Sequence, residues 1–168
     1  DIPKAMAGRP LRVTFERVLW RSRLFVDGRD MGQSQESLVS PHVYTIPRGL
    51  AEGAHEIELR VDNSKQYDIS YNEMCHAYTD ETQIKWNGVL GRMEITALAD
   101  VEIASLDVYP DVAGRRIRVA ARLSKHGGGR AKGVLTLGVR QLSTGCRLPV
   151  KSLRVALPDS ATDVTAWY

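Results

Sequence analysis

The chain has 168 residues, a mass of 18.7 kDa and a net charge of +3 at pH 7. With 43% hydrophobic and 26% charged residues, its composition is that of an ordinary folded protein and argues against disorder. No apolar run reaches the roughly 18 residues of a membrane-spanning helix, and the length excludes a complete (β/α)8 barrel of about 250 residues. Residues 1–111 carry 12 basic and 18 acidic side chains, whereas residues 112–168 carry 11 and 2. The two parts of the chain therefore differ strongly in charge.

Apolar and polar residues alternate along most of the chain, which predicts β-strands with one buried face. The alternation begins at residues 11–16 and resumes at Leu24 and Val26. These lead into Asp27-Gly28, a pair that favours a type I′ hairpin turn because both positions need positive φ. A short returning strand is expected after this turn, as far as Gly32.

The same alternation predicts the remaining strands. Within 101–109 the buried parity changes between Ile103 and Leu106, which predicts a β-bulge or a strand that crosses between domains. Residues 125–130 contain three consecutive glycines and are expected to form a hairpin loop. In chain order, the further predicted strands are 41–47, 55–62, 92–97, 101–109, 117–123, 134–140 and 150–157.

Between residues 63 and 91 the alternation disappears for 29 residues. An ordinary connection in a compact domain takes about 4–6 residues, so this stretch is expected to be a functional loop or a linker. Charge balance and strand spacing change again near Ala99 and Asp100, where we place a domain boundary. The chain is therefore predicted to be two all-β pieces in tandem.

Several catalytic and cofactor-binding patterns are absent from the sequence. It has no G-x-S-x-G elbow, and the glycines at 127–129 lack the Lys-Ser/Thr of a phosphate loop. Cys75 and Cys146 show no disulfide or metal-ligand spacing, which predicts two unpaired thiols, no metal site and no cofactor. Asn72-Glu73 is interpreted as a solvated loop pair, because a glycosidase needs two carboxyl groups on rigid elements about 5–9 Å apart.

The basic second part of the chain raises the alternative of nucleic-acid binding. Its arginines and lysines between residues 115 and 132 could form a phosphate-binding face. However, Trp167 and Tyr168 are the only aromatic residues after Tyr109, so no rings for base stacking are interleaved with the basic residues. We therefore prefer solvent-facing arginines that complement the acidic first part or another domain.

Near the end of the long loop, carboxylate, hydroxyl and amide groups surround an indole. These candidate carbohydrate-binding residues are Asp80, Glu81, Thr82, Trp86 and Asn87. Proteins bind sugars by placing the C–H face of the ring on an aromatic side chain and hydrogen-bonding the hydroxyls to Asp, Asn and Gln. In the alternative, Trp86 only plugs one end of a β-sandwich and Asn87-Gly88 is a turn.

Four segments, in this order, resemble the family 2 glycoside hydrolases, which include β-galactosidases, β-glucuronidases and β-mannosidases. The first, W-R-S-R-L-F-V-D-G-R-D-M-G at 20–32, resembles V-x-V-N/D-G-x-x-x-G. The second, at 40–63, resembles P-F-x-x-D-I-T…L-x-x-G-x-N-x-L-x-V-x-V-x-N. The third, W-N-G-V-L-G-R-M-E-I at 86–95, is similar to G-I-x-R-x-V-x-L. The fourth, at 101–109, resembles the strand that opens the family's immunoglobulin-like domain.

This resemblance covers roughly residues 9–125 and implies an all-β fold. Residues 1–99 would form a jelly-roll, galactose-binding-like β-sandwich that binds sugar. Residues 100–168 would form a partial immunoglobulin-like β-sandwich, and the small number of strands predicted there is consistent with a truncated domain. In the family a further (β/α)8 barrel carries both catalytic glutamates, so no catalytic residue is expected here. The family often places a sugar-contacting Asp six positions before the Gly that matches Gly88. That position is Thr82 in this chain, beside Asp80 and Glu81.

The implied function is that of a non-catalytic N-terminal portion of a β-glycosidase, which binds carbohydrate and positions a catalytic barrel that hydrolyses β-glycosidic bonds. The expected partners are a β-glycoside, the barrel domain and a second copy of the chain, with no membrane and no nucleic acid. The alternative is a structural or oligomerisation module without sugar binding of its own. Polysaccharide use suggests a secreted or periplasmic protein, and no signal peptide is expected within these residues.

Overall fold

The computed structural model describes residues 1–168 except 65, 68–85, 127–128 and 158–160. The regular elements of the described residues are all strands, which confirms the all-β prediction. The described residues contain no helix long and apolar enough to cross a membrane. The chain divides into two compact units, Asp1–Ala97 and Leu98–Tyr168.

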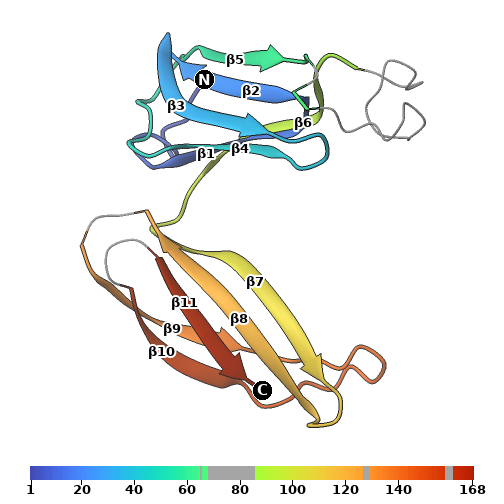
Figure 1. Cartoon of the computed structure of the whole chain (residues 1–168). Helices are drawn as coiled ribbons and strands as arrows, with labels where there is room; N and C mark the ends of the chain where they lie inside the picture. Colours follow the sequence, from blue (N-terminus) through green and yellow to red (C-terminus); the bar gives the residue numbers. More distant parts are fainter. Residues whose placement is uncertain (65, 68–85, 127–128, 158–160) are drawn as a thin grey trace, which may run out of the picture. The chain divides into compact units, whose positions relative to one another are not determined.

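The first unit consists of two three-stranded antiparallel sheets (Figure 1). One sheet has the order β4-β1-β6 and the other β3-β2-β5. The strands are β1 (Leu11–Leu19), β2 (Arg21–Val26), β3 (Arg29–Glu36), β4 (His42–Ile46), β5 (Ile57–Asp62) and β6 (Gly88–Ala97).

Alternating residues from strands of both sheets form the core of the first unit. Leu11, Leu24 and Tyr44 are completely buried, and they come from strands of both sheets. Each fully buried apolar side chain of this size contributes about 1.5–3 kcal/mol relative to its exposed state. Burial of one face of each sheet against the other is therefore what holds the two sheets together.

The hairpin between β2 and β3 turns at Asp27-Gly28, as predicted. Both residues have positive φ, 48° and 72°, which is the requirement of a type I′ turn. The Asp27 carboxylate also accepts hydrogen bonds from Nδ1 of His55 (2.7 Å) and from the backbone N–H of Glu56 (3.0 Å). The turn is thereby tied to the residues that lead into β5. The returning strand β3 is longer than predicted and runs to Glu36.

A β-bulge interrupts the pairing of β1 with β6. Phe15 is opposite Met93, but Arg17 is opposite Leu90, so β6 has one extra residue there. Gly91 supplies the positive φ of 78° that the bulge needs. The Glu16 carboxylate accepts the backbone N–H of Arg92 at 2.8 Å and so pairs a group that the bulge removes from the ladder.

The residues before β1 are packed onto the first unit. Ile2 is buried and exchanges both backbone hydrogen bonds with Gly53, at 2.7 and 3.0 Å. The N–H of Gly8 donates to the carbonyl of Leu50 at 2.7 Å. Gly49 lies so close to the backbone of Arg9 that a Cβ there would meet its carbonyl oxygen at 2.3 Å.

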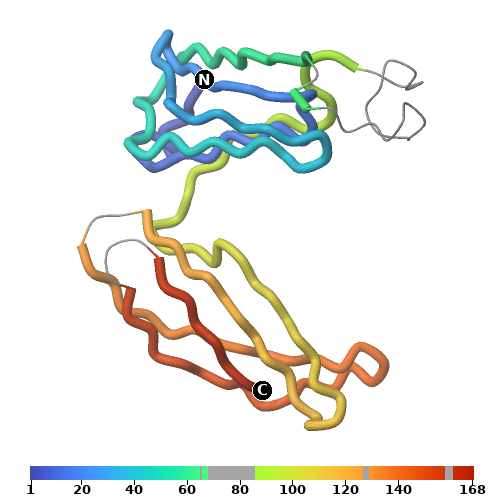
Figure 2. Tube along the Cα trace, viewed as in Figure 1, coloured from blue at the N-terminus to red at the C-terminus, as the bar shows by residue number. Residues whose placement is uncertain are grey.

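The second unit has one three-stranded sheet, β11-β8-β7, and one two-stranded sheet, β10-β9. Figure 2 traces the chain through them from yellow to red. Leu123, Val155 and Leu157 form the buried cluster that joins the two sheets. The strands are β7 (Val101–Asp111), β8 (Arg116–Lys125), β9 (Ala131–Leu137), β10 (Lys151–Leu157) and β11 (Ala161–Trp167).

Three features of the second unit bear on the sequence predictions. The register of β7 against β8 shifts between Ile103 and Ser105, which confirms the predicted β-bulge. The expected hairpin across residues 125–130 is wrong, because β8 and β9 lie in different sheets and β9 pairs with β10. Strand β11 was not predicted, because its apolar residues are mostly small.

Strand β7 leaves part of an apolar face uncovered. Leu106 and Val108 lie opposite Ala121 and Val119 and share their face of the sheet. Ala121 and Val119 are buried, whereas Leu106 and Val108 are each 55% exposed. The described strands therefore cover β8 but not the same face of β7.

Candidate functional site

Five strands of the first unit begin or end at one place. Arg21, at the start of β2, is opposite both Glu36 at the end of β3 and Asp62 at the end of β5. Leu19, at the end of β1, is opposite Gly88 at the start of β6. The side chains gathered here, called the strand-end cluster below, are Trp20, Arg21, Glu36, Asp62, Asn63, Gln66, Tyr67, Trp86 and Asn87.

The structure places two of the predicted sugar-binding residues in this cluster. The side chain of Asn87 accepts a hydrogen bond from Nδ2 of Asn63, which fixes the start of β6 beside the end of β5. The indole nitrogen of Trp86 is buried and has no hydrogen-bond partner among the described residues. A buried indole N–H is ordinarily paired, so this donor lacks the partner that such groups usually have. Asp80, Glu81 and Thr82 lie outside the described residues.

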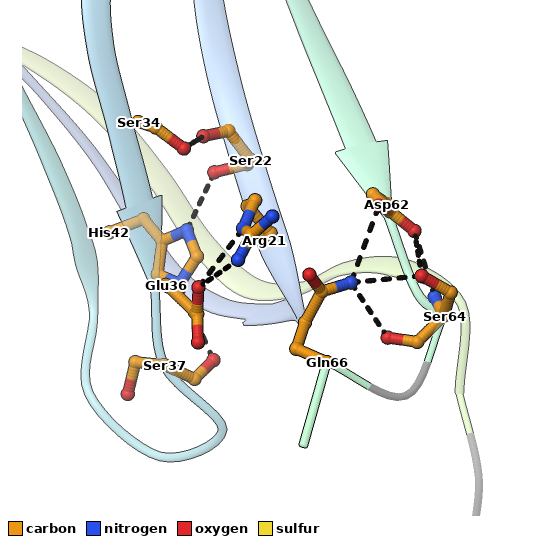
Figure 3. Close-up of polar contacts among 9 residues, drawn as sticks. All are labelled: Arg21, Ser22, Ser34, Glu36, Ser37, His42, Asp62, Ser64 and Gln66. Atoms are coloured by element: carbon orange, nitrogen blue, oxygen red, sulfur yellow. Dashed lines mark hydrogen bonds and ion pairs between the residues drawn. The ribbon is translucent and has the colours of Figure 1, made fainter.

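An ion pair organises the surface beside these residues (Figure 3). Oε2 of Glu36 accepts hydrogen bonds from Nε and Nη2 of Arg21, at 3.0 and 2.6 Å. A hydrogen bond from Tyr67 and the pair with Arg21 lower the pKa of Glu36, so this carboxylate is ionised at neutral pH. The same hydrogen bond raises the pKa of Tyr67. The three side chains present charged donors and acceptors together with an aromatic ring.

Two aromatic residues meet at this end of the unit. The rings of Trp20 and Tyr67 are 6.2 Å apart and inclined at 69°, an edge-to-face arrangement. Trp20 is buried, whereas Tyr67 is 58% exposed. The buried indole therefore supports an exposed phenol ring.

The chain that leaves β5 is held by the Asp62 carboxylate. Its Oδ1 accepts the backbone N–H and the hydroxyl of Ser64, at 2.9 and 2.6 Å. The side-chain amide of Gln66 donates to Oδ2 of Asp62 at 3.3 Å and to Ser64 at 2.9 Å (Figure 3). These hydrogen bonds from Ser64 lower the pKa of Asp62. These hydrogen bonds fix the backbone after β5, where the chain enters the long segment that contains Asp80, Glu81 and Thr82.

A shallow groove runs from this cluster over the outer face of β3-β2-β5. It has a volume of about 310 Å³, and Arg21 and Asp62 line both the groove and the cluster. Arg23 is paired with Asp30 at 2.7 Å, and Arg60 lies 4.8 Å from the centre of the Phe25 ring. The remaining groove residues are Ser22, Arg23, Ser34 and Arg60.

A second polar group is buried inside the first unit. Oγ of Ser22 lies 2.6 Å from Nδ1 of His42 and 2.7 Å from the hydroxyl of Tyr44. A serine next to a histidine is the arrangement of an activated nucleophile, but Ser22 and His42 are each only 1% exposed. A substrate could not reach them, so this group is structural.

Sequence reasoning did not single out Ser22, His42 or Tyr44, although the necessary signal was present. Ser22 has the same parity as Leu24 and Val26, and His42 has the same parity as Tyr44 and Ile46. The alternation that predicts a buried face therefore also predicts that these polar residues point inward. Arg21 and Glu36 carry no comparable signal, because only the strand pairing brings them together.

The opposite end of the first unit contains a cavity of about 440 Å³. It is lined mainly by apolar side chains, including Val26, Met31 and Ile46, with Arg29 and Arg48 at its rim. Within the described residues, no three His, Cys, Asp or Glu side chains are grouped as a metal site would require. Cys146 is an exposed free thiol, and Cys75 lies outside the described residues.

Comparisons with known proteins give matches in structure only. No known family model matches the sequence, and no curated protein matches it. The fold is similar to β-glucuronidase 2 of Bacteroides uniformis, with a TM-score of 0.80 and 12% identity over 99% of this chain and 20% of that one. A family 2 β-galacturonidase of Eisenbergiella tayi gives a TM-score of 0.66 and 16% identity, over 96% of this chain and 27% of that one.

A β-D-mannosidase of Dictyoglomus thermophilum gives a TM-score of 0.72 and 13% identity, over 100% of this chain and 23% of that one. This chain thus spans between a fifth and just over a quarter of these enzymes. At such low identities the similarity establishes the fold. The resemblance to family 2 glycoside hydrolases inferred from the sequence is therefore confirmed in the structure.

Proposed function

We propose that this chain is the non-catalytic N-terminal portion of a family 2-like glycoside hydrolase. Residues 1–99 act as a jelly-roll domain that binds carbohydrate. Residues 100–168 act as a partial immunoglobulin-like domain that helps to position a catalytic barrel. That barrel, outside this chain, would hydrolyse β-glycosidic bonds.

The observation that carries this proposal is the match of nearly the whole chain to a fifth of a β-glucuronidase. A chain that aligns over 99% of its length, through both units, shares the order of its strands with that enzyme. The enzymes it resembles act on β-glucuronides, galacturonides and mannosides according to their names, so a β-glycoside is the proposed ligand class.

The proposed sugar contacts are Asp80, Glu81, Thr82, Trp86 and Asn87. The strand-end cluster supports this assignment, because it supplies what sugar recognition needs at the place where Trp86 and Asn87 lie. The exposed ring of Tyr67 offers a stacking surface. The Arg21–Glu36 pair offers charged donors and acceptors for hydroxyls.

An amide-resolved NMR titration of the full chain with galactose, glucuronate and mannose tests this proposal. We expect shifts at 62–67, 80–88 and around Arg21, with one sugar preferred. Trp86→Ala should abolish these shifts while the spectrum stays dispersed. Leu142→Ala, at an exposed apolar residue of the second unit, is the control and should leave the binding of all three sugars unchanged. Binding that survives Trp86→Ala would contradict the assignment.

A structural or oligomerisation module is the second candidate, and the uncovered face of β7 favours it. The exposed side chains of Leu106 and Val108 are suited to burial against another protein surface. Sedimentation of the full chain distinguishes the two functions. Self-association that Leu106→Ser or Val108→Ser abolishes, together with no sugar-induced shifts, would favour this module over sugar binding.

A further inference from the structure

A row of aromatic and basic side chains crosses the three-stranded sheet of the second unit. Arg118 in β8 is opposite Tyr109 in β7 on one side and Trp167 in β11 on the other. Residues directly opposite each other in antiparallel strands project from the same face, so the three side chains form a row. Arg116, two residues before Arg118, projects from that face as well.

The two guanidinium groups are stacked on the two rings. The guanidinium carbon of Arg118 lies 4.0 Å from the centre of the Tyr109 ring, and that of Arg116 lies 4.2 Å from the centre of the Trp167 ring. Stacking fixes a guanidinium in one plane and leaves the N–H groups at its edge available for hydrogen bonds. The set of Tyr109, Arg116, Arg118 and Trp167 is called the arginine–aromatic row below.

The row is on the outer face of its sheet. Its neighbours of opposite parity, Val119 and Ala121, are buried and face the core of the unit. Tyr109 and Trp167 are 46% and 42% exposed, although both are large apolar rings. These two rings offer exposed apolar surface to a ligand, because ring burial is strongly favourable.

The charges around the row are mixed. Arg116 is paired with Asp111 at 2.8 Å, whereas Arg118 has no acidic partner among the described residues. Asp107 belongs to the next row on the same face, opposite Ala120, and Asp163 is 3.6 Å from Arg122. One guanidinium is therefore available for an anion, and carboxylates flank it on the sheet.

This arrangement revises an argument made from the sequence. The basic second part of the chain contains few aromatic residues, so rings for stacking were not expected among its arginines. The strand pairing nevertheless brings Tyr109 and Trp167, which are 58 positions apart, to the two sides of Arg118. Ring and cation are adjacent because of the fold rather than the local sequence.

We propose that the arginine–aromatic row is a binding site for glycans that contain a uronic acid. An exposed ring would stack against the C–H face of the sugar, and the edge of Arg118 would bind its carboxylate with two parallel hydrogen bonds. The inference rests on the proposed carbohydrate-related function and adds a second site, in the second unit, with a preference for acidic sugars.

The flanking carboxylates favour such a glycan over single-stranded nucleic acid. A nucleic acid carries a phosphate at every nucleotide and is bound along a continuous basic groove. Asp107, Asp111 and Asp163 interrupt any such track on this face. One carboxylate on a sugar ring needs only one available guanidinium beside one ring, and the row provides that.

The test is an amide-resolved NMR titration of the full chain with a galacturonate trisaccharide and with the matching galactose trisaccharide. We expect shifts at 107–111, 116–120 and 163–168 with the acidic trisaccharide only. Arg118→Gln should weaken its binding about tenfold, the loss expected for one charged hydrogen-bonded contact. Trp167→Ala should also weaken binding about tenfold, because it removes a ring on which the sugar stacks. Asp107→Asn should strengthen binding, because it removes a repelling charge. Arg122→Gln, on the same face but paired with Asp163, is the matched control and should change binding less than about twofold.

Three results would overturn the inference. These are equal binding of the neutral trisaccharide, tighter binding of an oligothymidylate to the same residues, and no shift in the second unit with the acidic trisaccharide. Shifts in the first unit report separately on the proposed sugar site around Trp86. The failure of one site is therefore distinguishable from the failure of the other.

Discussion

Ser22 and His42 are hydrogen-bonded across the interface between the two sheets of the first unit, with Oγ and Nδ1 2.6 Å apart. Nε2 of His42 faces the backbone carbonyl of Ser37 at 3.4 Å, and a carbonyl can only accept, so Nε2 carries the ring proton. Nδ1 therefore accepts the hydroxyl proton of Ser22. Ser22 in turn accepts the hydroxyl of Tyr44 at 2.7 Å. The hydrogen bonds therefore run in one direction inside the apolar core, from the Tyr44 hydroxyl to Ser22 and from the Ser22 hydroxyl to His42.

Ser22→Ala should destabilise the first unit by roughly 2–3 kcal/mol, because it leaves Nδ1 of His42 and the hydroxyl of Tyr44 buried without their partner. Urea unfolding followed through the amide signals of β1 and β4 measures this change for the first unit alone. Ser34→Ala is the control, because Ser34 is exposed and donates only a long hydrogen bond of 3.4 Å to the Ser22 carbonyl among the described residues. This variant should cost less than about 0.5 kcal/mol. Equal effects of the two variants would contradict the structural role given to Ser22.

Burial lowers the pKa of His42 below its usual value of 6.5. The unfolded chain then binds more protons than the folded one as the pH falls below 6.5, so His42 makes the first unit less stable toward lower pH. His55 acts in the opposite direction, because its hydrogen bond to Asp27 raises its pKa and its contribution is lost as the pH rises.

His42→Gln should therefore flatten the loss of stability between about pH 7 and pH 5, whereas His55→Gln should steepen it. Urea midpoints measured across this range, on the same amide signals, give both slopes. A pH dependence that is unchanged in His42→Gln would show that this histidine is not buried in its neutral form.

Glu36→Gln should bring the pKa of Tyr67 back down toward its usual value of 10, because the hydrogen bond to the Glu36 carboxylate is the main cause that raises it. The carbon chemical shift of the Tyr67 ring, followed against pH, reports this pKa directly. Glu58→Gln, in β5, is the matched control, because Glu58 is paired with Arg60 at 4.0 Å rather than with a tyrosine. If the pKa of Tyr67 were unchanged in Glu36→Gln, the hydrogen bond between Tyr67 and Glu36 would be contradicted, and with it the place of Tyr67 in the strand-end cluster.

Gly91→Ala and Gly32→Ala should differ in stability although both glycines have positive φ, 78° and 73°. Each substitution should lower the free energy of unfolding by about 1–2 kcal/mol, because an L-residue is strained in this conformation. A Cβ at Gly91 would in addition come within 2.6 Å of Oε2 of Glu16, whereas a Cβ at Gly32 has open space. Gly91→Ala should therefore be the more destabilising variant in thermal unfolding, and Glu16→Ala should reduce the difference between the two.

Strands β1, β2 and β5 of the first unit were predictable, because each packs one face on the core and therefore alternates apolar and polar residues. Leu24 and Val26 identify β2, and Asp27-Gly28 identifies its turn. In the second unit the same signal weakens, since the apolar residues of β11 that pack on the core are only Val164 and Ala166, both small, among the described residues. Alternation does not indicate which strands pair with each other. For this reason the hairpin predicted at 125–130 was wrong.

The candidate site was predictable in part for a similar reason. Trp86 and Asn87 stand out in the local sequence, and both belong to the strand-end cluster. Arg21, Glu36 and Tyr67 come from three separate segments that only the fold assembles. The extra residue of Gly-Val-Leu-Gly-Arg at 88–92, relative to the G-I-x-R pattern, is accommodated by the bulge at Gly91.

Ile2 contacts the core of the first unit and is hydrogen-bonded in both directions to Gly53. The first residues of this chain therefore act as an additional short edge of the fold. Trimming them would be a core mutation rather than the removal of a tail, because it would expose the apolar surface under Ile2 and leave both backbone groups of Gly53 without their partners. A protease that cut before Leu11 would be expected to loosen residues 49–53 as well, at a distance of some forty positions in the sequence.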